Sequence, residues 1–114
     1  MNKYGVLTTG EELANTDAEL YETIKDPGTY RLKLDFRTWY SRGYTYGLIA
    51  HFSDEDGNKY RLFAFRHMVD GQEIYNPKKS KIAFEKVEDG TIWDCVVDNN
   101  KKGKAEWMDA IPVA

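Results

Sequence analysis

Hydrophobic and polar residues alternate most regularly in the segment from residue 30 to residue 37. Each apolar residue in it is followed by a charged one, and the apolar positions are Tyr30, Leu32, Leu34 and Phe36. A period of two is typical of a β-strand with one buried and one solvated face. The pattern predicts a strand from about residue 29, and similar apolar runs predict others near 44–53, 59–68, 80–87, 90–98 and 104–110.

The segment before this strand has a helical pattern. Thr16-Asp17-Ala18-Glu19 matches a capping box, in which the threonine hydroxyl accepts a backbone N–H and the glutamate reaches back to the cap. Leu20 and Ile24 are spaced one helical turn apart. Asp26-Pro27-Gly28 would end the helix, because proline disfavours helix at the residue before it. These signals predict an N-terminal helix.

Three Asp-Gly pairs, which adopt positive φ readily and favour hairpins, divide the rest of the chain. They are Asp56-Gly57, Asp70-Gly71 and Asp89-Gly90, and the third is expected to join strands 82–87 and 91–97. Together these signals predict an α+β fold. It would consist of an N-terminal helix followed by an antiparallel, strongly twisted or barrel-like sheet of five to six strands. The expected core comprises Leu32, Leu34, Phe36, Phe63, Phe65, Ile82, Phe84 and Val96.

Composition narrows the class of protein. A chain of 114 residues with 41% hydrophobic and 31% charged residues is typical of a single globular domain, here residues 1–114. No apolar run approaches the roughly 20 residues of a membrane span, and the N-terminus lacks the apolar stretch of a signal peptide. Cys95 is the only cysteine and there is no N-x-[ST] site, so we expect a cytoplasmic protein without membrane contact.

Motifs of catalysis are absent from the sequence, which contains no G-x-S-x-G, P-loop or G-x-G-x-x-G. Asp54, Asp56 and Asn58 have the alternating spacing of a calcium loop, but Gly57 comes too early, so a hairpin turn is expected there. His51, His67 and Cys95 could form a cysteine–histidine pair only if the fold joined them, and a buried inert thiol is expected instead. We therefore predict a non-catalytic binding protein with no metal or cofactor.

Residues 30–66 hold all five arginines and ten of the sixteen aromatic rings. Arginine and large rings are enriched where protein surfaces bind partners. The rings flank an expected turn at Ser41-Arg42-Gly43, where Trp39 either lies exposed or folds over the sheet as a plug. The predicted partner-binding residues are Arg37, Trp39, Tyr40, Arg42, Tyr44, Arg61 and Arg66.

Two lysine-rich segments of the form K-K-x-K, at 78–81 and 101–104, lie in expected loops. Lysines in loops can neutralise phosphates without reading a base sequence, and they can also serve only to keep a β protein soluble. The candidate phosphate contacts are Lys78, Lys79, Lys81, Lys101, Lys102 and Lys104.

A macromolecular partner fits these features best, and three classes remain open. The first is nucleic acid, single-stranded as in OB-like binders, or a protein that handles nucleic acid. The net charge of −3 and the pI near 5.4 count against it. The second is an inhibitor or adaptor that binds protein, of the phage or mobile-element anti-defence type. The third is a small-molecule-binding barrel lined by Trp39, Trp93 and Trp107.

Overall fold

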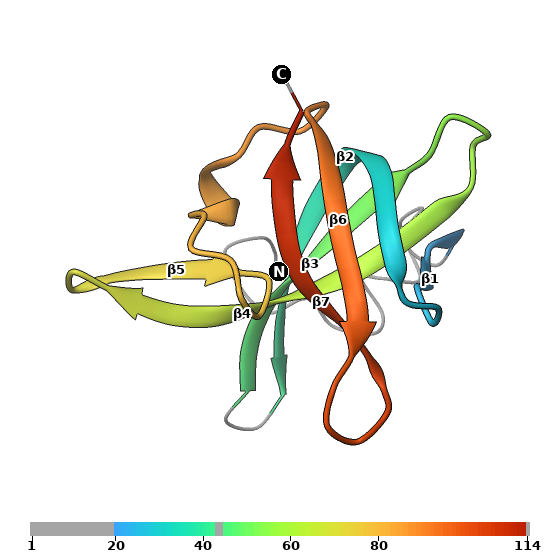
Figure 1. Ribbon diagram of the computed structural model, residues 1–114. Coiled ribbons are helices and arrows are strands. Elements are labelled where there is room, and N and C mark those ends of the chain that lie inside the picture. Colours follow the sequence, from blue (N-terminus) through green and yellow to red (C-terminus); the bar gives the residue numbers. More distant parts are fainter. Residues whose placement is uncertain (1–19, 43–44, 114) are drawn as a thin grey trace.

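The computed structural model describes residues 20–42 and 45–113, and it is nearly all sheet (Figure 1). The helical element with defined bounds is a short 3₁₀ turn, η2 (Phe84–Lys86). No described helix has the length and apolar character that crossing a bilayer requires. The strands are β1 (Glu22–Thr23), β2 (Gly28–Arg42), β3 (Thr45–Ser53), β4 (Lys59–Val69), β5 (Gln72–Asn76), β6 (Ile92–Asn99) and β7 (Ala105–Pro112).

The prediction of an α+β fold with an N-terminal helix is wrong. Residues 22–23 form β1, which pairs in parallel with β4, and the described residues contain no α-helix. The capping box at 16–19 lies outside the described residues. Tyr21 and Ile24 are buried while Leu20 is exposed, so packing against the sheet decides the local structure rather than the Leu20–Ile24 spacing. The sheet is also open and mixed, with seven strands in place of five to six antiparallel ones.

Five of the expected strands agree with β2, β3, β4, β6 and β7 to within a few residues. The strand expected at 80–87 is wrong, because this segment is a loop that carries η2. The strand β5 was not expected. It forms because Asp70 and Gly71, with φ of 50° and 76°, make a tight turn that folds β5 back onto β4.

The long strand β2 serves two partners and contains a β-bulge at Asp35. Its first half pairs with β6 and its second half with β3. Leu34 pairs with Phe52, and the next pair is Phe36 with His51, so one extra residue lies in β2. A bulge of this kind moves all later side chains to the opposite face. Phe36 therefore leaves the expected core face, and the residues at 37 and 39 turn toward it.

The bend of β2 lays β6 and β7 across β3 and β4, and the core lies between them (Figure 1). We call the covered side of β2–β4 the inner face and the opposite side the outer face. The buried core includes Leu32, Leu34, Leu48, Ala50, Phe52, Leu62, Ala64, Phe84, Trp93, Cys95, Val97 and Trp107.

Three of the expected core residues, Leu32, Leu34 and Phe84, are confirmed as buried. The other five are only half-buried, and Ile82 packs against the edge of the core. Within β4, the inner positions are Leu62 and Ala64, which pair with Ala50 and Leu48. Phe63 and Phe65 therefore lie on the outer face, so the prediction that they pack inward is wrong. Val96 lies opposite a bulge at Met108 of β7 and alternates with the buried Cys95 and Val97.

Candidate functional site

Two of the predicted partner-binding residues, Arg37 and Trp39, have structural contacts on the inner face. The Arg37 guanidinium donates to the backbone carbonyls of Phe84 and Glu85 and forms an ion pair with Asp89 at 3.4 Å. Trp39 is half-buried and meets the Tyr75 ring edge to face, with ring centroids 4.6 Å apart. The bulge at Asp35 places both side chains on this face. Of the two alternatives for Trp39, the structure therefore supports the one in which the indole folds over the sheet.

Replacement of Trp39 by alanine should consequently destabilise the protein. Loss of a half-buried indole and its Tyr75 contact is expected to lower the free energy of unfolding by about 1–3 kcal/mol, less than for a fully buried tryptophan. Urea melts of Trp39→Ala measure the change. Tyr46→Ala, which removes an exposed ring at the same end of the sheet, is the control and should cost less than about 1 kcal/mol. Equal melting of Trp39→Ala and the parent would contradict the assignment.

The other predicted residues separate into two places. Arg66 is exposed and lies over the Tyr46 ring, 4.9 Å from its centroid, near the base of the β4–β5 hairpin. Tyr40 and Arg61 both lie on the outer face and line one pocket together. The side chains of Arg42 and Tyr44 lie outside the described residues. The predicted site is therefore divided, and of its described side chains Tyr40 and Arg61 come together.

The outer-face pocket, of about 290 Å³, is predominantly apolar and lies between β1 and strands β2–β4. Tyr40 meets Phe63 edge to face at 5.4 Å. The Arg61 Nε donates to the Thr23 hydroxyl at 3.2 Å, and no ion pair of Arg61 occurs among the described residues. The pocket is lined by Thr23, Tyr40, Ile49, Arg61, Leu62 and Phe63.

The two lysine loops are brought to the same end of β7. The first loop runs along this strand, where the backbone N–H of Lys78 donates to the Trp107 carbonyl at 2.9 Å and that of Lys79 to the Met108 carbonyl at 2.7 Å. The second loop is the β6–β7 turn, residues 100–104. Asn100 shapes it by accepting the backbone N–H groups of Lys102 and Lys104 at 2.8 and 3.0 Å.

Glu106, at the start of β7, connects the two loops. Its carboxylate forms an ion pair with the Lys78 ammonium at 2.8 Å and accepts the Asn100 side-chain amide at 2.7 Å. The Lys78 contact and the Asn100 contact lower the pKa of Glu106, so this carboxyl stays ionised. The Lys78 ammonium is therefore already paired with a carboxylate. We expect it to contribute less to phosphate binding than the other lysines of the two loops.

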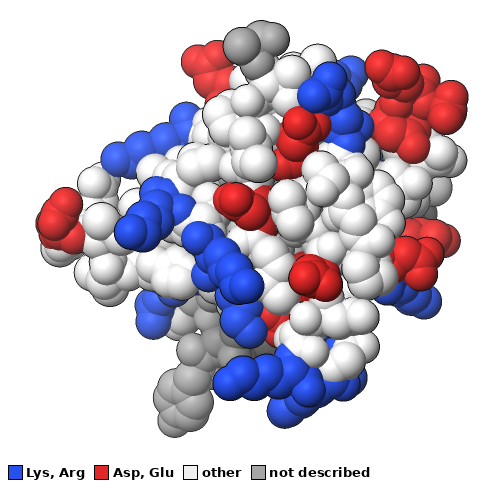
Figure 2. Space-filling view, in the orientation of Figure 1, with Lys and Arg blue, Asp and Glu red and all other residues white. Residues whose placement is uncertain are grey.

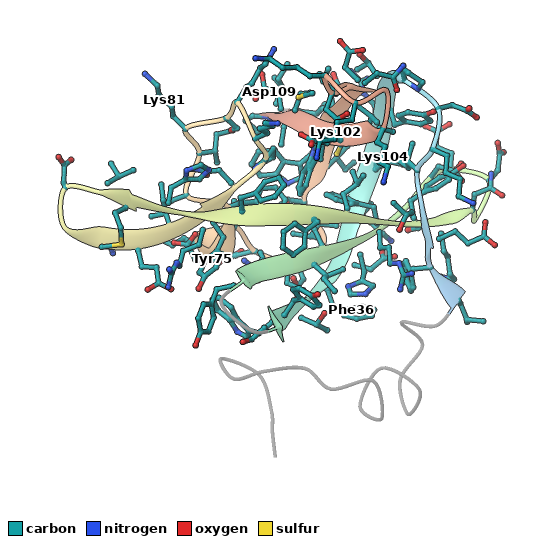
Figure 3. The ribbon with its side chains drawn as sticks, turned by 90° about the horizontal axis from the view of Figure 1, so that it is seen from below. Phe36, Tyr75, Lys81, Lys102, Lys104 and Asp109 are labelled. Carbon is teal, nitrogen blue, oxygen red and sulfur yellow. The ribbon has the colours of Figure 1, made fainter. Side chains whose placement is uncertain are left out.

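We call the five other lysines of the two loops the lysine face. They are exposed and have no ion pair within the described part of the chain: Lys79, Lys81, Lys101, Lys102 and Lys104. Figure 2 shows basic side chains gathered around the β6–β7 turn, with acidic groups between them. Lys81, Lys102 and Lys104 lie on one side of the sheet and Phe36 on the other (Figure 3).

Sequence reasoning missed the residues that link the two regions. Phe63 and Phe65 were assigned to the core because both are apolar, and Asn100 and Glu106 have no sequence signal of their own. A small cavity of about 100 Å³ lies in the gap between β4 and β7, lined by both phenylalanines, Ala105 and Glu106 among others. It shares Thr23, Leu62 and Phe63 with the outer-face pocket. The two cavities are therefore neighbours.

Cys95 and His51 do not come together in the described structure. Cys95 is fully buried on the core side and burial raises the pKa of its thiol, while His51 lies on the outer face. Asp54 accepts the backbone N–H groups of Asp56 and Asn58 at 2.9 and 2.8 Å, as expected of a turn. No group of three or more His, Cys, Asp and Glu side chains that could hold a metal ion occurs within residues 20–42 and 45–113.

Each of the three tryptophans packs on another ring of the described residues. Trp93 and Trp107 are buried around Phe84, with ring centroids at 5.1 and 5.0 Å from it, and Trp39 packs on Tyr75.

Comparison of the chain with protein-family models, with curated proteins and with solved structures finds no match. Function is therefore inferred from the chemistry of the described residues.

Proposed function

We propose that this protein is a non-catalytic binding protein that holds the phosphate backbone of a nucleic acid on its lysine face. The observation that carries the proposal is the convergence of two lysine loops, more than twenty residues apart in sequence, through the Lys78–Glu106–Asn100 contacts. Five exposed ammonium groups without carboxylate partners among the described residues suit a polyanion. The arginine and aromatic residues of the sheet contribute less to binding than the sequence predicts, because Arg37 and Trp39 have structural contacts on the inner face.

The acidic net charge of −3 sets the kind of binding to expect. A protein that is acidic elsewhere repels a polyanion except at a basic cluster, so contacts should be few and local. Affinity should fall linearly with salt on logarithmic axes, by about 0.7 of slope for each phosphate contact to a single strand. A cytoplasmic location belongs to the same proposal. It is supported by the single cysteine, which is buried, and by the absence of N-x-[ST] sites.

Neutralising one lysine loop tests the proposal. In a Lys101→Gln, Lys102→Gln, Lys104→Gln variant, the salt-dependence slope for an oligonucleotide should fall in magnitude by about 2, with weaker binding at every salt concentration. The control variant is Lys25→Gln, Lys33→Gln, Lys86→Gln, which removes the same charge from exposed lysines elsewhere. Fluorescence anisotropy measures both. Equal slopes in the two variants would overturn the lysine face as the binding site.

A protein partner is the second candidate, favoured by one observation. Near its turn the β4–β5 hairpin exposes Met68 and Val69, which follow the exposed Arg66 in β4, and 64% of Met68 is exposed. Exposed apolar side chains next to arginine are typical of protein interfaces. A partner retained after nuclease treatment, bound normally by the lysine variant and lost from Met68→Asp would favour this candidate over nucleic acid.

A further inference from the structure

The lysine face and the outer-face pocket are joined by a continuous row of residues. Glu106, which ties the lysine loops together, also lines the small cavity between β4 and β7. Phe63 lines both this cavity and the outer-face pocket. Phe65 meets Phe63 edge to face at 4.9 Å, and Phe63 meets Tyr40 at 5.4 Å. Three rings thus lead from the cavity that Glu106 lines to the outer-face pocket.

The outer-face pocket has the size and the chemistry of a site for one flat ring. Its volume of about 290 Å³ lies at the lower end of ligand pockets, which usually measure roughly 300–1,000 Å³. Its apolar lining includes the Tyr40 and Phe63 rings, on which a planar group can stack. A folded duplex cannot enter such a pocket, because its bases are stacked on one another.

Arg61 supplies the polar contact in this pocket. Its Nε is used by the Thr23 hydroxyl, which leaves the two terminal nitrogens of the guanidinium for a ligand. These nitrogens can donate to a base carbonyl or to a phosphate oxygen. His51, which pairs with Arg61 across the strands, is buried and its pKa is lowered to about 4, so it adds no positive charge near neutral pH.

We propose that the outer-face pocket takes a single unpaired nucleobase, and that the ligand of this protein is therefore single-stranded nucleic acid. The inference rests on the proposed function. The lysine face holds phosphates, the strand follows Phe65 and Phe63, and one base lies against Tyr40 with Arg61 at its edge. Stacking on rings accepts every base, so little sequence preference is expected.

The test compares three ligands and two variants by fluorescence anisotropy at one salt concentration. The ligands are an oligo(dT) strand of roughly 12 nucleotides, within the usual range of small single-strand binders, the same backbone with abasic sites, and a duplex of equal length. Tyr40→Leu keeps an apolar side chain but removes the ring. It should weaken oligo(dT) binding by roughly 5- to 100-fold, the range for loss of one stacked base. Tyr40→Phe, which keeps the ring, should bind as the parent does.

The abasic strand should bind the parent and Tyr40→Leu equally and weakly, since it has phosphates but no base. Melting curves establish that both variants are folded. Equal binding of the abasic strand, the duplex and oligo(dT), with no effect of Tyr40→Leu, would overturn the single-strand inference. If binding still depended on Lys101, Lys102 and Lys104 in that case, the proposed function would stand. Absence of binding to all three ligands would overturn both.

Discussion

Replacing Phe84 with alanine is expected to lower the free energy of unfolding by about 3–5 kcal/mol, the largest effect of any change considered. Phe84 is completely buried, and three other core rings surround it. Their centroids lie 6.2, 5.1 and 5.0 Å from that of Phe84 and belong to Phe52, Trp93 and Trp107. Alanine would leave a large cavity among side chains held by two layers of sheet, which cannot collapse into it.

The position of Phe84 makes this prediction informative, because the residue lies on a loop and not on a strand. The turn η2 is held in place by Arg37, which donates to its carbonyls, and by Glu85, which accepts the Tyr75 backbone N–H at 2.9 Å. Urea melts of Phe84→Ala provide the measurement. Lys86→Ala, an exposed change in the same turn, is the control and should cost less than about 0.5 kcal/mol. A loss below about 1 kcal/mol for Phe84→Ala would show that η2 does not close the core.

Acidification from neutral pH to about pH 4 should cost the fold about 3 kcal/mol through His51 alone. The His51 ring is buried between Tyr21, at 5.0 Å, and Phe36, stacked at 4.2 Å. Burial is the main reason that its pKa falls from 6.5 to about 4, and the charge of Arg61 lowers it further, while Asp35 acts in the opposite direction.

The direction of this pH effect follows from where the proton binds. Between pH 6.5 and 4 the unfolded chain binds a proton at His51 and the folded protein does not, so acid favours unfolding. The contribution of the neutral imidazole is complete above pH 6.5 and is lost as the pH falls to about 4. His51→Phe keeps a ring beside Phe36 and cannot titrate. Over this interval in urea melts, the variant should lose about 3 kcal/mol less than the parent. Parallel pH profiles of the two proteins would contradict the assignment.

The sheet was predictable from the sequence to the extent that alternation and turns define strands. The alternation from Tyr30 to Leu34 and the Asp56-Gly57 turn correctly indicate β2, β3 and β4. The side of the sheet that each residue occupies was not predictable beyond Asp35. A single bulged residue leaves the spacing of residue types unchanged and yet exchanges the faces of the residues after it in the same strand.

The sequence predicts which types of residue form the candidate site, but it does not predict where in the fold they lie. Tyr40, Arg61 and the lysine loops were all selected from the sequence, but Arg37 and Trp39 were selected with them because arginine and tryptophan serve cores and interfaces equally. The meeting of the lysine loops depends on Glu106, a carboxylate that no local pattern distinguishes from the other acidic residues of the chain. Phe63 entered the site only because its neighbours, Leu62 and Ala64, face the core.

The divided pairing of β2 has a consequence for the chain as it leaves the ribosome. Strands β3, β4 and β5 can form hairpins with β2 and one another as soon as residue 76 has emerged, but residues 28–32 of β2 pair only with β6, which begins at residue 92. Until then the nascent polypeptide presents an unpaired strand edge beside the apolar side chains of Leu32 and Leu34. The interval between the emergence of β5 and that of β6 is therefore the one in which this protein is most open to aggregation and most dependent on chaperones.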